Sequence, residues 1–215
     1  MPSTLHYIFD PLCGWCYAAS PLLRHAVTAL GNGLTLQFHP GLMFDSPRNL
    51  GPDWRSYILN ADQRIHQLTG VPFGKPYIDW LLSDAPMVLE STTPTLALLA
   101  ARQLESSLTL DMLEAIQAAR YQRGEDICDP AHLAKLAGAL GFNEATFTTA
   151  MTKQATQLDE CVSEARQRLH AAGGQGFPTF ILETASGLHR LDHGRHYGNP
   201  QTFIDQIRSL TGATA

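Results

Sequence analysis

Two cysteines separated by two residues, Cys13 and Cys16, lie in the stretch FDPLCGWCYAASP near the start of the chain. Thiols at this spacing can close a disulfide, provide half of a metal site, or remain reduced inside a core. A structural zinc site needs two further ligands at short spacing, whereas Cys128 and Cys161 are isolated from each other. The pattern therefore favours redox catalysis over zinc, and inert packing of the pair stays open.

Three histidines near the C-terminus, His189, His193 and His196, are the other residues of a type that binds metals. Their HxxxH spacing has little specificity when it falls in a loop, so we interpret them as side chains of a solvated strand edge and loop. We expect no metal site. Cys128 and Cys161 are interpreted as small buried apolar residues on helices, with a regulatory thiol as the alternative.

The elements around the cysteine pair predict a βαβ unit. An apolar run over 5–9 reads as a buried strand, helical spacing follows over 13–30, and alternation over 34–38 indicates a second strand. Cys13 then lies at the start of the helix, where free backbone N–H groups and the helix dipole favour a thiolate. This placement predicts Cys13 as the nucleophile and Cys16, one turn further in, as the resolving thiol.

The rest of the chain predicts a helical block followed by a ββα unit. Nearly every segment from 53 to 172 has helical period, and loops around 45–52 and 173–176 are its joints. Strands at 179–183 and 188–191 and a helix over 200–210 follow. We expect an α/β fold in three parts, with two halves of one domain at 1–52 and 173–215 and a helical insertion domain at 53–172.

Composition narrows the classes of function. The 215 residues carry a formal net charge of −5, which argues against a nucleic-acid partner because such proteins usually gather a basic excess. We expect no membrane partner, since no run reaches the ~18 apolar residues of a membrane span. The first residues also lack the basic and apolar regions of a signal peptide, so we expect a cytoplasmic protein. In a reducing compartment, a close cysteine pair is typically catalytic or metal-binding.

A second informative stretch is GQGFPTFILE, in which Phe177-Pro178 follows a glycine-rich loop and opens a strand. The residues alone leave two possibilities open, an ordinary trans proline at a strand start and a cis peptide bond.

Taken together, these residues resemble the thioredoxin superfamily, and within it the DsbA-type oxidoreductases that carry a helical insertion. The features that carry the resemblance are Cys13-Gly14-Trp15-Cys16 at the helix start, Pro21 in the same helix, and Phe177-Pro178-Thr179. The stretches DPLCGWCY, GQGFPTF, DICDPAHLAKLAGALG, GPDWRSYI and TGVPF resemble the FrnE-like branch of that family. The resemblance covers essentially the whole chain and implies a thioredoxin fold with a large all-helical insertion.

The resemblance also implies roles for the site residues. Pro178 would be cis, and the residue before it, Phe177, would offer its backbone to an extended substrate. Gly14, Trp15 and Thr179 would complete the active site and substrate-binding region, with the helical block as a lid. Trp15 has two open interpretations, packing between core and lid, or an aromatic rim around the reactive sulfur.

One position departs from the family pattern. Proteins of this family commonly hold a buried acid six residues before the first cysteine, and that position here is Tyr7. We interpret Asp10, three residues before Cys13, as an ordinary turn or cap residue beside Pro11.

The leading hypothesis is a thiol–disulfide oxidoreductase, or disulfide isomerase, that acts on disulfides of proteins or small thiols. It needs no cofactor, and glutathione is the candidate redox partner. The alternative is a glutathione-dependent isomerase or transferase, of the hydroxychromene-carboxylate isomerase or kappa type, in which a single Ser or Cys activates glutathione. Cys16 speaks against that alternative, because such an enzyme has no use for a resolving thiol. A non-catalytic binding module is the third possibility.

Overall fold

A four-stranded mixed sheet forms the centre of the computed structural model, which describes residues 3–83, 85–86 and 88–212. The strand order is β2-β1-β5-β6, with β1 parallel to β2 and antiparallel to β5, and β5 antiparallel to β6. The strands are β1 (Ser3–Phe9), β2 (Leu34–Pro40), β5 (Thr179–Thr184) and β6 (Gly187–Leu191). The four strands predicted from the sequence are confirmed, with shifts of one or two residues at their ends.

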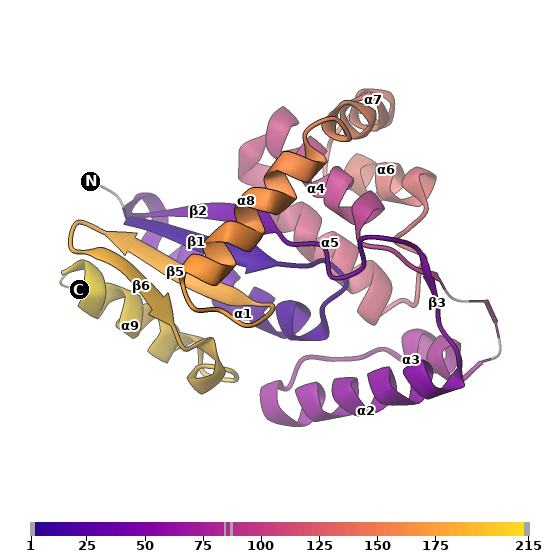
Figure 1. Cartoon of the computed structure of the whole chain (residues 1–215), viewed down its shortest axis with the longest axis horizontal. Coiled ribbons are helices and arrows are strands. Elements are labelled where there is room, and N and C mark those ends of the chain that lie inside the picture. Colours follow the sequence, from indigo (N-terminus) through magenta and orange to yellow (C-terminus); the bar gives the residue numbers. More distant parts are fainter. Residues whose placement is uncertain (1–2, 84, 87, 213–215) are drawn as a thin grey trace.

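Both faces of the sheet are covered by helices, which explains why Leu5, Tyr7, Ile8 and Phe9 of β1 are all buried. Alternate residues of a strand point to opposite faces. Tyr7 and Phe180 pack in the main core, whereas Ile8 and Ile181 pack against residues of α8 (Leu158–Ala171). On the opposite face lie α1 (Gly14–Leu30) and α9 (Pro200–Thr211), which contact each other (Figure 1). The βαβ and ββα arrangement expected of a thioredoxin fold is therefore confirmed.

The insertion between β2 and β5 contains seven helices among the described residues, and α8 is the last of them. The other six are α2 (Pro52–Thr69), α3 (Lys75–Leu82), α4 (Thr92–Leu104), α5 (Thr109–Tyr121), α6 (Pro130–Ala139) and α7 (Glu144–Gln154). The described residues also form three single-turn 3₁₀ helices, one within the insertion at Ser106–Leu108 and two outside it at Gly31–Gly33 and His193–Arg195. Within the described residues, no helix has the length and apolar content needed to cross a membrane.

Two features of the insertion differ from the all-helical block expected. Two strands of two residues each, β3 (Arg48–Asn49) before α2 and β4 (Val88–Leu89) after α3, pair with each other in antiparallel orientation. The last helix, α8, packs on β1 and β2, on the side of the sheet that α1 and α9 leave open, and its first turns also contact α4 of the insertion. Helical period alone predicts that a segment is a helix, but it does not identify the surface on which the helix packs.

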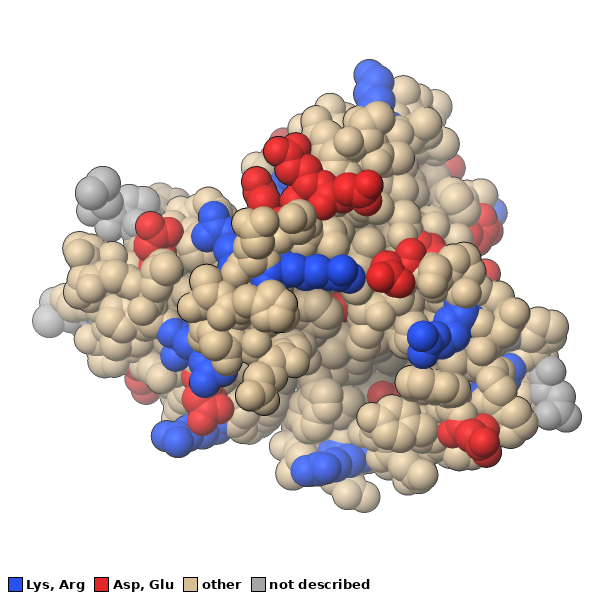
Figure 2. Space-filling model, in the orientation of Figure 1, with Lys and Arg blue, Asp and Glu red and all other residues tan. Residues whose placement is uncertain are grey.

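The arrangement of the insertion positions two of its helices beside the start of α1. Helices α4 to α7 gather beyond one end of the sheet, and α2 and α3 form a separate pair below them (Figure 1). Helix α2 contacts α1 and α3. On the face drawn in Figure 2, the surface is hollowed between the α2–α3 pair and the rest of the molecule.

Candidate active site

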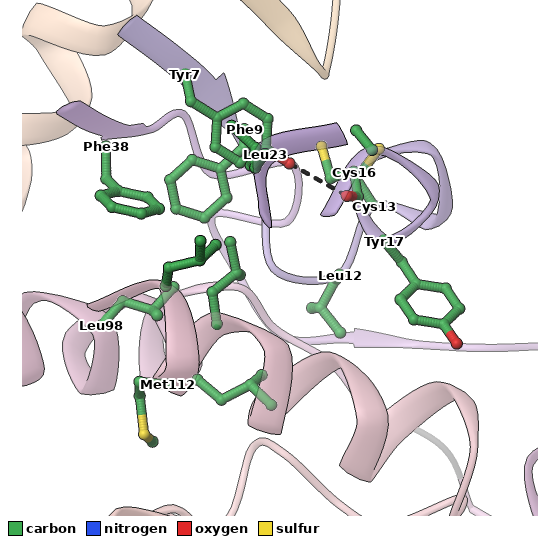
Figure 3. Packing of buried hydrophobic residues seen from close by; sticks show 14 of the residues in the cluster. Tyr7, Phe9, Leu12, Cys13, Cys16, Tyr17, Leu23, Phe38, Leu98 and Met112 are labelled. Carbon is green, nitrogen blue, oxygen red and sulfur yellow. Dashed lines mark hydrogen bonds between the residues drawn. The ribbon is translucent and has the colours of Figure 1, made fainter. Parts of the chain in front are cut away.

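Cys13 is the N-cap residue of α1. Its backbone is extended (φ −85°, ψ 117°), its N–H donates to the Asp10 carbonyl at 3.2 Å, and its carbonyl accepts from the Tyr17 N–H at 3.0 Å. Cys13 and Cys16 are both free thiols, and their relative exposures are 7% and 0%. Both residues are therefore buried, with Cys13 the less completely covered, and Figure 3 shows their side chains close together.

Cys16 is held as a thiol by its surroundings. Complete burial is the largest cause that raises its pKa well above the usual value, and the neighbouring Cys13 adds to this effect. A hydrogen bond from the backbone of Asp10 lowers the pKa, and the charge of the Asp10 carboxyl group raises it. With its pKa raised overall, Cys16 stays protonated near neutral pH.

The loop before β5 closes over Cys13. The Phe177–Pro178 peptide bond is cis, as the family resemblance implies. The Cys13 thiol donates to the Phe177 carbonyl, with 3.5 Å between sulfur and oxygen. Thr179 fixes the loop from the strand side, since its hydroxyl donates to the Gly176 carbonyl at 2.8 Å. The two informative stretches of the sequence, far apart along the chain, therefore meet at one sulfur.

Trp15 packs against the C-terminal part of the chain. Its ring centroid lies 5.7 Å from that of Tyr197, and its carbonyl accepts from the Tyr197 hydroxyl at 3.3 Å. Trp15 is partly buried and packs against the main core, and its aromatic partner belongs to the segment after β6. Both interpretations of Trp15 therefore stay predictions. Tyr197 is close enough to the dithiol for charges on Cys13 and Cys16 to raise its pKa, although burial is the larger cause.

Asp10 is a turn residue, as predicted, but it is also completely buried. One carboxyl oxygen accepts from the Leu12 N–H at 2.7 Å, and the other accepts from the Met43 N–H at 2.6 Å. Burial is the main cause that raises its pKa. Asp10 thus joins the segment before α1 to the segment after β2. At the position of the usual buried acid, the Tyr7 hydroxyl donates to the Cys16 carbonyl at 3.2 Å (Figure 3).

The insertion also contributes to the site, through residues that the sequence analysis did not identify. The Tyr121 hydroxyl of α5 donates to the Leu12 carbonyl at 2.8 Å, next to Cys13. On α2, Asp62 and Ile65 lie so close to Gly14 that a Cβ built on the glycine would be 2.8 Å and 2.9 Å from their side chains. A signal for this contact exists in the sequence, because Asp62 interrupts the apolar stripe of α2 three residues before Ile65.

The three histidines do not form a cluster, but one of them borders the site. His193 lines a surface pocket together with Phe177, Pro178 and Thr179. His189 contacts Thr184 and Ser186, and His196 contacts Thr202 and Gln206. His196 is buried, so its interpretation as a solvated side chain is wrong. In the described part of the chain, no three His, Cys, Asp or Glu side chains are grouped so that they could hold a metal ion.

The two isolated cysteines are half-buried. Cys161 lies on α8, as expected of a helical residue. Cys128 lies in the turn before α6, so its predicted place on a helix is wrong. Burial raises the pKa of Cys128 to about 11, which makes it a poor nucleophile near neutral pH.

Comparisons with known proteins agree with this geometry. The DSBA-like thioredoxin domain family matches residues 4–197. Among solved structures, the cytosolic disulfide reductase DsbM from Pseudomonas aeruginosa is 40% identical, with a TM-score of 0.87 over 96% of this chain and 98% of that one. The structure of the same protein with GSH is also 40% identical, with a TM-score of 0.86 over the same shares. A Nitrosomonas europaea protein, 24% identical with a TM-score of 0.81 over 98% and 99% of the chains, supports the fold alone. No curated protein sequence matches significantly.

Proposed function

The chain belongs to the DSBA-like thioredoxin domain family and is a thiol–disulfide oxidoreductase, and we propose that it reduces disulfides with Cys13 as the nucleophile and Cys16 as the resolving thiol. The observation that carries the assignment of roles is the difference between the two sulfurs. Cys13 lies at the open end of α1 against the Phe177 carbonyl, and Cys16 is completely buried with a raised pKa.

The reaction balances as two exchanges. The Cys13 thiolate attacks a substrate disulfide, a bond forms between Cys13 and one substrate sulfur, and the other substrate sulfur leaves as a thiolate. Cys16 then loses its proton to water, and its thiolate attacks the Cys13 sulfur and releases the second substrate thiolate. The dithiol has lost two electrons and two protons, the substrate disulfide has gained the electrons, and the protons reach the two product thiolates through water.

We propose glutathione as the reductant that returns the protein to the dithiol. Two glutathione molecules would supply the two electrons and leave as glutathione disulfide. The 40% identical reductase from Pseudomonas aeruginosa has a structure with GSH, which supports this choice. That relative is described as cytosolic, which supports a cytoplasmic location for this chain, where the glutathione poise keeps most dithiols of this type reduced.

The test is a redox titration of the dithiol together with single-cysteine variants. In glutathione buffers of defined ratio, thiol alkylation and mass spectrometry should show one reversible two-electron transition that links Cys13 to Cys16. Cys13→Ser should abolish insulin reduction, and Cys16→Ser should accumulate a mixed disulfide with glutathione at Cys13. Cys161→Ser is the matched control, because it removes a half-buried thiol from α8 and should leave the rate unchanged.

Two results would overturn the proposal. An unchanged insulin-reduction rate in Cys13→Ser would remove Cys13 from the reaction. If no Cys13–Cys16 disulfide formed at any ratio, and Cys16→Ser kept full turnover with glutathione and an electrophile, the protein would instead be a glutathione-dependent isomerase or transferase.

A further inference from the structure

Helix α2 of the insertion places a carboxyl group at the N-terminal end of α1. Asp62 is buried, with 6% exposure, on the face of α2 that packs against α1. One of its oxygens lies where a side chain on Gly14 would be, 2.8 Å from the ideal Cβ position. Because Gly14 follows Cys13 in the chain, bond lengths place this oxygen within about 8 Å of the Cys13 Cα.

The groups around Asp62 hold the carboxyl in place without neutralising it by an ion pair. Its other oxygen accepts from the Tyr77 hydroxyl of α3 at 2.8 Å. The buried guanidinium of Arg120, on α5, lies over the Tyr77 ring at 5.7 Å and the Tyr121 ring at 5.5 Å. No ion pair within 4.0 Å joins Asp62 to a cation among the residues that the structure describes.

We propose that Asp62 sets the reduction potential of the Cys13–Cys16 pair, as a carboxylate at the end of α1 that disfavours the Cys13 thiolate and so makes the dithiol a stronger reductant. The inference rests on the proposed function, because it assigns a residue to the dithiol described above. Asp62 does not touch the reacting sulfur and acts through its charge, opposite in sign to the helix dipole that favours a thiolate there.

The direction and size of the effect follow from Coulomb's law. A negative charge near Cys13 destabilises the thiolate but not the neutral disulfide, so the charge favours the oxidised protein and lowers the potential. The charge of the thiolate is on the sulfur, which lies up to about 3 Å beyond the Cα. At about 11 Å, dielectric constants between those of a protein surface and water give a change of about 2- to 13-fold in the equilibrium constant. That range corresponds to about 8 to 33 mV for two electrons.

The effect should depend on pH in a way that a packing role would not. Burial raises the pKa of Asp62 to about 6, while the Tyr77 hydrogen bond and the charge of Arg120 oppose the rise. The titratable and charged groups that face Asp62 are Tyr77 from α3, Arg120 and Tyr121 from α5, Cys13 at the start of α1, and His66 on its own helix. Above its pKa the carboxylate is charged and lowers the potential, and below its pKa this influence is lost.

The experiment compares the potentials of Asp62→Asn and wild type in glutathione buffers at about pH 7.5 and about pH 5. Asparagine keeps the shape and an oxygen that can accept from Tyr77. At the higher pH the variant should be the weaker reductant by about 8 to 33 mV, and its Cys13 should react faster with iodoacetamide. At the lower pH the difference should disappear. Asp53→Asn, in the exposed first turn of the same helix, makes the same charge change about 13 Å away along the helix and should shift neither quantity.

A second variant keeps the carboxyl and moves its titration. Tyr77→Phe removes the hydrogen bond that favours the ionised carboxyl, so the pH at which the potential changes should rise. Equal potentials for wild type and Asp62→Asn at the higher pH, or a difference that persists unchanged at the lower pH, would refute the inference. If wild type formed no Cys13–Cys16 disulfide at all, the proposed function itself would fail, and the two failures are therefore distinguishable.

Discussion

Replacing Gly41 by alanine should displace the loop that faces Cys13. Gly41 follows β2, and its N–H donates to the Phe9 carbonyl at 2.8 Å, so its backbone is fixed. A Cβ at this position would lie 2.2 Å from Cζ and 2.4 Å from Cε1 of the Phe177 ring. Ordinary van der Waals contact begins at 3.4 Å, so the ring has to move by at least about 1.2 Å.

The cost should appear in both stability and catalysis. Inserting a methyl group into packed surroundings typically costs about 1–3 kcal/mol of the free energy of unfolding. The Phe177 carbonyl accepts from the Cys13 thiol at 3.5 Å, so a shift of the residue also changes the position of the group that faces the sulfur. Misplacement by about 1 Å can cost about 100-fold in rate, and we expect kcat/KM for disulfide reduction to fall by about tenfold or more.

The assay is urea unfolding under reducing conditions, together with insulin reduction, for Gly41→Ala, Phe177→Leu and the double variant. Leucine lacks the two ring atoms that meet the new methyl group, so the double variant should be more stable than the sum of the single effects predicts. The close approach of Gly41 and Phe177 would be refuted if Gly41→Ala had the wild-type urea midpoint and the wild-type rate of insulin reduction. It would also be refuted if the stability changes of the two single variants were additive in the double variant.

Two further predictions concern stability alone. Gly74→Ala puts a Cβ 1.8 Å from the carbonyl oxygen of Gln122, a backbone atom that cannot move aside easily, and should lower the free energy of unfolding by about 3 kcal/mol or more. Gly33→Ala is the control, because open space surrounds that position and the free energy should change little. Equal unfolding curves for the two variants would contradict this prediction. Burial is the main cause that lowers the pKa of His39 to about 3, so between that pH and about 6.5 the unfolded chain binds more protons. The free energy of unfolding should therefore fall as the pH decreases from about 6.5, and His39 should contribute up to about 1.4 kcal/mol per pH unit to this fall. His39→Gln should lose that contribution. Parallel pH profiles of urea unfolding for the variant and the wild type would count against the prediction.

The parts of the site that could be predicted from the sequence are those that local pattern determines. The apolar run of β1 and the helical spacing after Cys13 place that cysteine at a helix start without any tertiary information. The order of the two cysteines along the helix then predicts which is buried more deeply, and Cys16 is, although Cys13 is buried as well. The cis peptide bond at Pro178 came from family resemblance, because the two flanking residues alone leave the isomer open.

The contacts made by the insertion could not be predicted in the same way. Asp62 and Tyr121 are far from the cysteines along the chain, and they reach them through the packing of α2 and α5 on α1. Helical period predicts those helices but leaves their neighbours undetermined, as α8 shows by packing on the sheet. The one local signal for Asp62 is chemical, because a carboxyl group within an apolar stripe is costly to bury and so indicates a position with a specific partner.

The backbone of Leu12 shows why distant parts of the chain should influence the exchange. Its N–H donates to Asp10, which also accepts from Met43, and its carbonyl accepts from Tyr121 of the insertion. The residue before Cys13 is therefore fixed on one side by the loop after β2 and on the other by α5. Because the sulfur position depends on this peptide, a shift of α5 moves Cys13 relative to the Phe177 carbonyl, which a different segment holds. We therefore expect the insertion to influence the reaction by positioning Cys13 through the backbone of Leu12.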